Sequence, residues 1–232
     1  MLLDEQYTEL RSLVAKFSDL EVAPLAAKID KEEKIPSDLI QKLGEQGFLG
    51  SYVPEEYGGA GMDYMSYAIL VEEISRQCAS TGVLISAHTS LCVWPIMHFG
   101  TETQKKKYLP RLASGEAIGC FCLSEPNAGS DAGSLTTFAE DKGTHYEITG
   151  MKNWITNGRE AKIAVVFAKT KKTPDHKGMS AFIVETNTPG FSVIKIEEKL
   201  GIKGSSTAQI ALDKVIVPKE NLLGELEKGF KI

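Results

Sequence analysis

The chain has 232 residues, of which 42% are hydrophobic and 25% charged, so it has ordinary globular composition and enough length for one large domain or two smaller ones. Its formal net charge of -5 argues against a nucleic-acid partner, because neutralising phosphates requires a surplus of lysine and arginine. The four cysteines show neither zinc-like spacing nor the density of a disulfide scaffold, which favours reduced thiols in a cytosol or mitochondrial matrix.

The first half of the chain, from Asp4 to about Ser114, reads as helical. Apolar residues recur three and four positions apart between Tyr7 and Leu20, as they do on one face of a helix. Further helices are predicted over 37–46, over 63–78 and after the capping box TETQ that begins at Thr101. The amino terminus carries acidic residues at once, so we predict no signal peptide. No apolar run approaches the length of a bilayer span, and we expect no transmembrane segment.

After Ala117 the pattern changes to short runs rich in β-branched and aromatic residues, separated by Gly, Pro, Asn or Asp. Gly150 lies between two such runs, where a hairpin turn is expected. Helices followed by strands indicate segregated layers without βαβ winding. We therefore predict an α+β fold, with a helical domain over 1–116 and a small β-barrel or sandwich over 117–225.

Two segments combine residue types that suit a ligand site. The first, GCFCLSEPNAGSDAG at 119–133, joins a strand to a small-residue loop of the kind that exposes backbone amides to anions. The second, MKNWITNG at 151–158, places an aromatic ring and a hydroxyl two residues apart, on the same face of a strand. Taken singly, Phe121 and Trp154 would more often be core aromatic residues. Only the two segments together favour contact with a ligand.

Both segments, in this order, resemble the flavin-binding signature of the acyl-CoA dehydrogenase family, with the closest likeness to its short-chain or butyryl members. The likeness extends to QKKKYLPRLASGE, to VPEEYGGAGMD and to KLGIKGSSTAQIALDKVIVPKENLLGELEKGFKI, and so covers nearly the whole chain. It implies FAD as the cofactor and an acyl-CoA as the substrate, oxidised to the trans-2-enoyl-CoA. Electrons would pass to an electron-transferring flavoprotein.

The resemblance also implies roles for individual residues. The expected cofactor-binding residues are Phe121, Leu123, Ser124, Ser130, Trp154, Ile155 and Thr156. In the family pattern, the Ser124 hydroxyl bonds the pyrimidine edge of the flavin, Trp154 covers the ring, and Thr156 lies near the N5 atom. Ser130 would also contact the CoA substrate. We assign no metal, because His88 and His98 are more naturally ordinary core or surface histidines.

The family's catalytic glutamate lies in a helical carboxy-terminal domain, which residues 226–232 would only begin. We therefore expect the catalytic base to be absent and assign no catalytic residue in this chain. We expect Glu125 to hold its loop and not to act as a base. The resemblance also implies a homotetramer. It further implies a location in the cytoplasm or in the mitochondrial matrix. Two alternatives remain open: a non-catalytic flavin- or acyl-CoA-binding chain or subunit of a split enzyme, and a related oxidase with the same signature.

Overall fold

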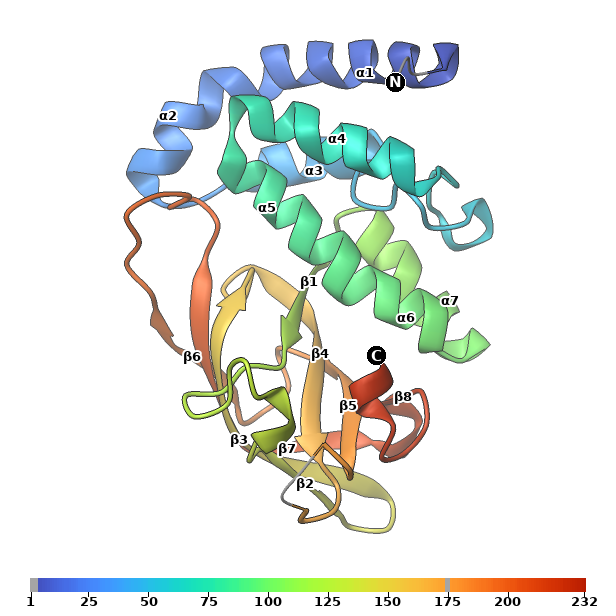
Figure 1. Cartoon of the computed structure of the whole chain (residues 1–232), viewed down its shortest axis with the longest axis vertical. Helices are drawn as coiled ribbons and strands as arrows, with labels where there is room; N and C mark the ends of the chain where they lie inside the picture. The colour runs from blue at the N-terminus through green and yellow to red at the C-terminus, as the bar shows by residue number, and fades with distance from the viewer. Residues whose placement is uncertain (1–3, 174–175) are drawn as a thin grey trace.

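A helical layer is stacked on a layer of β-strands in the computed structural model, which describes residues 4–173 and 176–232 (Figure 1). The α-helices, in chain order, are α1 (Glu5–Phe17), α2 (Ala23–Glu32), α3 (Ser37–Glu45), α4 (Tyr64–Gln77), α5 (Ala79–Ala87), α6 (Trp94–Phe99) and α7 (Glu102–Ala113). Two π-helical segments, Ser18–Val22 and His88–Val93, join α1 to α2 and α5 to α6.

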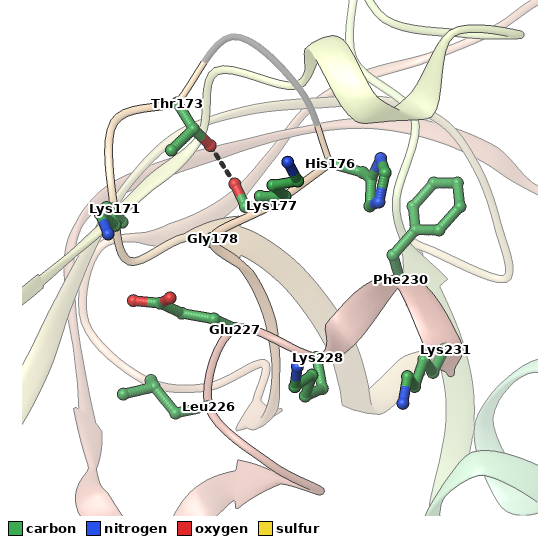
Figure 2. A pocket seen from close by; sticks show the side chains of 10 residues that line it. All are labelled: Lys171, Thr173, His176, Lys177, Gly178, Leu226, Glu227, Lys228, Phe230 and Lys231. Carbon is green, nitrogen blue, oxygen red and sulfur yellow. Dashed lines mark hydrogen bonds between the residues drawn. The ribbon is translucent and has the colours of Figure 1, made fainter.

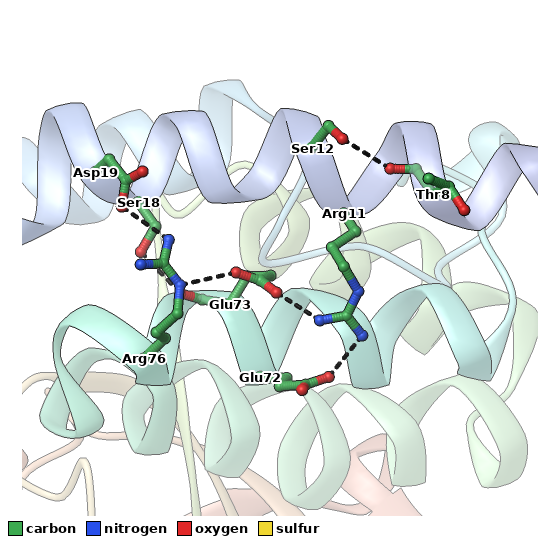
Figure 3. A network of polar contacts seen from close by, with 8 residues as sticks. All are labelled: Thr8, Arg11, Ser12, Ser18, Asp19, Glu72, Glu73 and Arg76. Atoms are coloured by element: carbon green, nitrogen blue, oxygen red, sulfur yellow. Dashed lines mark hydrogen bonds and ion pairs between the residues drawn. The ribbon is translucent and has the colours of Figure 1, made fainter. Parts of the chain in front are cut away.

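Helices α1 and α4 are held together by a network of ion pairs around one buried carboxylate (Figure 3). Glu73 is only 7% exposed and accepts from Arg11 at 2.5 Å and from Arg76 at 3.0 Å. Arg11 also reaches Glu72, and Arg76 reaches Asp19 on the π-helical segment. The network satisfies a charge that burial alone would make costly.

The helix boundaries follow the local signals in the sequence. Helix α3 begins at the predicted Ser37, and α4 begins after Asp63, whose carboxylate caps the helix by accepting from the Ser66 backbone N–H at 2.8 Å. Helix α7 opens with the predicted capping box, in which Thr101 and Gln104 bond each other's backbone N–H groups. These helix predictions are confirmed.

One helical run contradicts the sequence prediction about apolar length. Ala79–Phe99, which joins α5, a π-helical segment and α6, has 21 residues, and its most apolar window has a mean hydropathy of 1.2, so the run is long and apolar enough to cross a bilayer. The prediction that no run reaches this length is therefore wrong. A core helix passes the same test, and 56% of the most apolar window in this run is buried inside the protein, so length and composition alone do not assign a membrane span.

The strands form one mixed sheet beneath the helices (Figure 1). They are β1 (Ile118–Cys122), β2 (Phe138–Asp141), β3 (His145–Thr156), β4 (Ala161–Lys169), β5 (Met179–Glu185), β6 (Phe191–Ile196), β7 (Thr207–Pro218) and β8 (Leu222–Leu223). Their order is β6-β7-β3-β2-β4-β5-β8, and β1 pairs in parallel with β4. Among the described residues, no α-helix connects these strands, so the predicted α+β class without βαβ winding is confirmed.

The hairpin turn predicted at Gly150 is wrong, because this glycine lies inside the long strand β3. The pairing of β3 with β7 shifts between Ile148 and Gly150, so the strand is bent there. A Cβ at Gly150 would lie 2.3 Å from the hydroxyl of Thr137. The glycine therefore marks a close approach of two segments, which a sequence pattern does not distinguish from a turn.

The helical layer and the sheet share a hydrophobic cluster. A single cluster of buried residues contains Tyr52, Val93 and Tyr108 from the helical layer together with Phe167 and Ile183 from β4 and β5. Apolar surface is removed from water on both sides of the contact, so each layer supplies part of the other's core.

Polar contacts reinforce the same junction. The buried Asn157 side chain donates to the carbonyl of Leu84 in α5 at 3.0 Å, and the backbone N–H of Gly119 donates to Nδ1 of His88 at 2.9 Å. A Cβ at Gly119 would lie 2.4 Å from the sulfur of Cys92, so only glycine lets β1 come this close to the helices. The junction therefore fixes the start of β1 against the helical layer.

Candidate functional site

A pocket of about 200 Å³ lies where the segment after β1 meets the end of β3 and the helical layer. Its lining residues are Leu91, Phe121, Leu123, Ser124, Trp154, Ile155 and Thr156. We call it the β1–β3 pocket. The two sequence segments predict six of these residues, and the structure brings all six together. Leu91, from the π-helical segment, is the residue that sequence reasoning missed.

Trp154 is presented to this pocket by a β-bulge. The pairing of β3 with β7 shifts between Lys152 and Ile155, so two residues of β3 face one residue of β7. Trp154 has a φ of 61°, and its side chain is 60% exposed. A left-handed backbone at a bulky residue costs on the order of 1 to 3 kcal/mol, and such strain clusters at functional sites. A large exposed ring held in this way is suited to covering a planar ligand.

Beside Ser124, the loop after β1 is anchored by a buried ion pair. Glu125 and Lys152, with side chains 3% and 0% exposed, lie 2.8 Å apart. Lys152 also donates to the carbonyl of Leu123 at 3.0 Å. The carboxylate accepts further hydrogen bonds from the backbone N–H groups of Thr136 and Thr137 and from the Thr136 hydroxyl. The pair therefore joins three segments of the chain around the pocket.

Glu125 is held as a carboxylate. Burial by itself raises the pKa of Glu125, but the charge of Lys152 and the hydrogen bonds outweigh it and bring the pKa to about 2. Burial lowers the pKa of Lys152, yet its ammonium group lies within hydrogen-bond distance of the carboxylate, and we assign the pair as ionised. A carboxylate stabilised to this extent is a poor base at neutral pH, so Glu125 holds the loop in place.

This ion pair predicts acid sensitivity. Because the folded-state pKa of Glu125 lies below the ordinary value of 4.5 for a glutamate, its contribution to stability is complete above pH 4.5 and is lost as the pH falls toward 2. We expect the urea midpoint of the wild-type chain to fall over this range more steeply than that of the double variant Glu125→Gln/Lys152→Met. Equal slopes for the two proteins would contradict the assignment.

Ser130 is not brought into the β1–β3 pocket. It lies in the exposed loop between β1 and β2, away from the seven lining residues. The same loop passes beside a second pocket, because a Cβ at Gly133 would lie 3.2 Å from the backbone nitrogen of His176. The loop thus connects the two pockets, and Ser130 is positioned between Glu125 and Gly133 along the chain.

The second pocket is rich in basic side chains (Figure 2). It has a volume of about 560 Å³ and is lined by Lys171, Thr173, His176, Lys177, Gly178, Leu226, Glu227, Lys228, Phe230 and Lys231. Four lysines face one glutamate, and the rings of His176 and Phe230 lie 4.7 Å apart at its edge. Positive charge beside aromatic rings suits a ligand that carries both phosphate groups and a base. We call it the basic pocket.

The remaining candidates lie outside the two signature segments. A hollow of about 780 Å³ lies between the start of α3 and the starts of β1 and β4, and none of its lining residues belongs to 119–133 or 151–158. His88 is fully buried, which lowers its pKa to about 4 and makes it a neutral core residue. Within 4–173 and 176–232 there is no cluster of three His, Cys, Asp or Glu side chains that could hold a metal ion.

Comparison with known proteins identifies the family. The family model of the acyl-CoA dehydrogenase N-terminal domain matches residues 4–116, and the family model of the acyl-CoA dehydrogenase middle domain matches residues 120–215. The short-chain specific acyl-CoA dehydrogenase of Clostridium acetobutylicum is 50% identical over 96% of this chain and 59% of its own length. The mitochondrial short-chain specific enzyme of Rattus norvegicus is 48% identical over 99% of this chain and 56% of its own length.

A solved structure agrees with the sequence comparisons. The crystal structure of acyl-CoA dehydrogenase from Bacillus anthracis complexed with FAD matches with a TM-score of 0.91 and 40% identity, over 99% of this chain and 39% of that one. The chain thus spans less than two thirds of the length of these relatives. With the helical layer, the mixed sheet and both signature segments in place, the chain belongs to the acyl-CoA dehydrogenase family.

Proposed function

We propose that this chain takes part in the FAD-dependent α,β-dehydrogenation of a short-chain acyl-CoA and that its β1–β3 pocket receives the flavin ring. The observation that carries the proposal is the convergence of six residues from two distant segments, 121–124 and 154–156, on one pocket. At about 200 Å³ the pocket is smaller than the usual 300 to 1,000 Å³ of complete ligand sites, and so it suits part of a cofactor.

The lining residues have complementary tasks in this proposal. Phe121 and Leu123 offer an apolar wall, and the exposed Trp154 covers the opposite face of the ring. The hydroxyls of Ser124 and Thr156 are half-buried at the same pocket and provide the hydrogen bonds that orient a heteroaromatic ring. FAD, when bound, supplies the acceptor for the hydride that leaves the substrate β carbon. The protein's part is to fix the geometry, from which much of the rate of such reactions comes.

The basic pocket is the proposed site for the phosphate-bearing part of CoA. Four lysines there offer charge complementarity to phosphates (Figure 2). The loop with Ser130 leads from the β1–β3 pocket to Gly133, which lies beside His176 at the edge of the basic pocket. This keeps Ser130 as a proposed CoA contact rather than a contact to the flavin ring. The acyl end of the thioester would then point toward Leu91.

The base that removes the α proton is proposed to come from outside the β1–β3 pocket. None of the seven lining residues in the described part of the chain carries a carboxylate, and Glu125 is committed to Lys152. We further propose an electron-transferring flavoprotein as acceptor, a homotetrameric assembly and a cytoplasmic or mitochondrial-matrix location, which the family resemblance supports. The proposed domain division stays at 116/117.

Flavin binding tests this proposal. The purified chain is titrated with FAD, then desalted, and its visible spectrum is recorded before and after anaerobic addition of butyryl-CoA. We expect saturable FAD binding that the double variant Ser124→Ala/Thr156→Val weakens by roughly tenfold or more, since each hydroxyl contributes about 1 kcal/mol. Ser12→Ala is the matched control, because the exposed Ser12 hydroxyl donates to the Thr8 carbonyl within α1. This variant should bind FAD as the wild type does.

The outcomes separate the parts of the proposal. FAD binding without bleaching by butyryl-CoA supports a ring site whose base lies elsewhere, and it also fits the alternative of a non-catalytic flavin-binding chain. Bleaching would show that a working base lies within these residues and overturn the placement of the base. Absence of saturable FAD binding would overturn the assignment of the β1–β3 pocket.

A further inference from the structure

We propose that the buried Glu125–Lys152 ion pair is the positioning element of the β1–β3 pocket: it sets the distance between Ser124 and Trp154 that a planar ring has to fill. The inference rests on the proposed function, because it assigns to this pair the task of shaping the flavin-ring site. Neither residue lines the pocket, so both are positioning residues and not catalytic ones.

The place of the pair in the chain makes it a link between the two walls. Glu125 directly follows Ser124, and Lys152 precedes Trp154 by two residues. The contact between Lys152 and Glu125 at 2.8 Å therefore fastens one wall to the other. A second link runs parallel to it, since the backbone N–H of Asn153 donates to the carbonyl of Ser124 at 2.8 Å.

The pair also anchors the strained part of β3. The β-bulge begins after Lys152, and the left-handed Trp154 lies within it. A strained backbone persists only where its surroundings over-determine it. On the far side of the bulge, the backbone N–H of Asn157 donates to the carbonyl of Ser206 at 3.0 Å. With Lys152 fixed on one side and Asn157 on the other, the residues between them are held in the bulged path.

The hydrogen bonds to its carboxylate fix the orientation of the Glu125 side chain. Oε1 accepts from Lys152 and the Thr137 N–H, and Oε2 accepts from the N–H and the hydroxyl of Thr136. Four bonds from two directions leave the side chain a single position. A site has to be held to within about 0.5 Å to work, and supporting groups of this kind provide that precision.

Trp154 itself reports on the inference. The chain has two tryptophans, so a Trp94→Phe background leaves Trp154 as the sole indole fluorophore. In that background we compare the double variant Glu125→Gln/Lys152→Met, which removes both charges together, with the parent. We expect a changed acrylamide quenching constant for Trp154 and FAD binding weakened by roughly 10- to 100-fold, as is typical when supporting groups around a site are removed.

Two further variants separate positioning from general stability. Glu73→Gln disturbs the other buried carboxylate network, between α1 and α4, and is expected to lower the melting temperature while leaving Trp154 quenching and FAD affinity unchanged. Thr136→Val removes one hydroxyl bond to Glu125 at 2.8 Å and keeps both charges paired. It should shift Trp154 quenching in the same direction as the double variant, by less, and it decides the matter where the double variant does not fold.

A folded double variant whose Trp154 quenching and FAD affinity equal those of the parent would overturn the inference. If the double variant does not fold, the same result for Thr136→Val would overturn it. An equal change of Trp154 quenching in Glu73→Gln would overturn it as well, since the pair would then act only through overall stability. Should the parent chain fail to bind FAD, the proposed function falls, and the quenching of Trp154 still tests whether the pair positions the bulge.

Discussion

Replacing Lys152 by alanine is expected to lower the free energy of unfolding by about 3 to 5 kcal/mol, the typical cost of leaving one charge of a buried pair without its partner. The Lys152 side chain is fully buried, and its ammonium group bonds both the Glu125 carboxylate and the Leu123 carbonyl. In the variant, the carboxylate keeps its threonine hydrogen bonds but loses its counter-charge. Urea unfolding at pH 7, followed by circular dichroism, measures the loss.

Lys28→Ala is the matched control for this prediction. Lys28 forms an ion pair with Glu32 on α2 at 4.0 Å, with both side chains more than half exposed. Pairs of this kind contribute about 0 to 1 kcal/mol, and alanine is a good helix former. The control should therefore unfold within about 0.5 kcal/mol of the wild type. Similar losses in the two variants would mean that burial of the Glu125–Lys152 pair has no special weight.

A second large effect is expected at Gly44, inside α3. Substituting alanine for glycine within a helix usually stabilises by about 0.5 to 1 kcal/mol. Here, however, a Cβ would lie 2.0 Å from the carbonyl oxygen of Ser114 and 2.5 Å from its carbon, in the turn after α7. Both are backbone atoms that cannot rotate away. We expect Gly44→Ala to destabilise by about 2 to 3 kcal/mol, within the range of overpacked cores.

The sign of the change makes this prediction decisive, because helix propensity and packing predict opposite outcomes. Gly201→Ala is the control, since a Cβ at Gly201 meets no atom within 4 Å. Thermal unfolding of both variants should show a lowered midpoint for Gly44→Ala and a midpoint near that of the wild type for Gly201→Ala. A stabilised Gly44→Ala variant would show that α3 and the turn after α7 are free to move apart.

Features encoded over a few neighbouring residues were predictable from the sequence. The Thr101–Gln104 capping box and the start of α3 at Ser37 depend on local signals, and the structure has both. The two signature segments also carry their residues in contiguous strings, so the family resemblance predicts six of the pocket residues. Such features need no knowledge of how distant segments pair.

Features that depend on tertiary pairing were missed. The sequence alone does not show that Lys152 meets Glu125, which is 27 positions away, because the contact depends on how β3 lies beside the segment after β1. Strict alternation along a strand places Trp154 and Thr156 on one face but gives no sign of the bulge that brings Ile155 into the same pocket. Leu91 escaped notice because a leucine in an apolar helix carries no signal of its own.

Tyr108 and Phe167 belong to the hydrophobic cluster shared by the two layers, so we expect the helical layer and the sheet to unfold together. Unfolding of the sheet would expose the buried faces of α6 and α7 to water, and unfolding of those helices would expose β4 and β5 (Figure 1). The proposed division at 116/117 therefore separates two architectures without separating two cooperative units. Calorimetry of this chain should record one endotherm rather than two, and a lesion in either layer should lower the same transition.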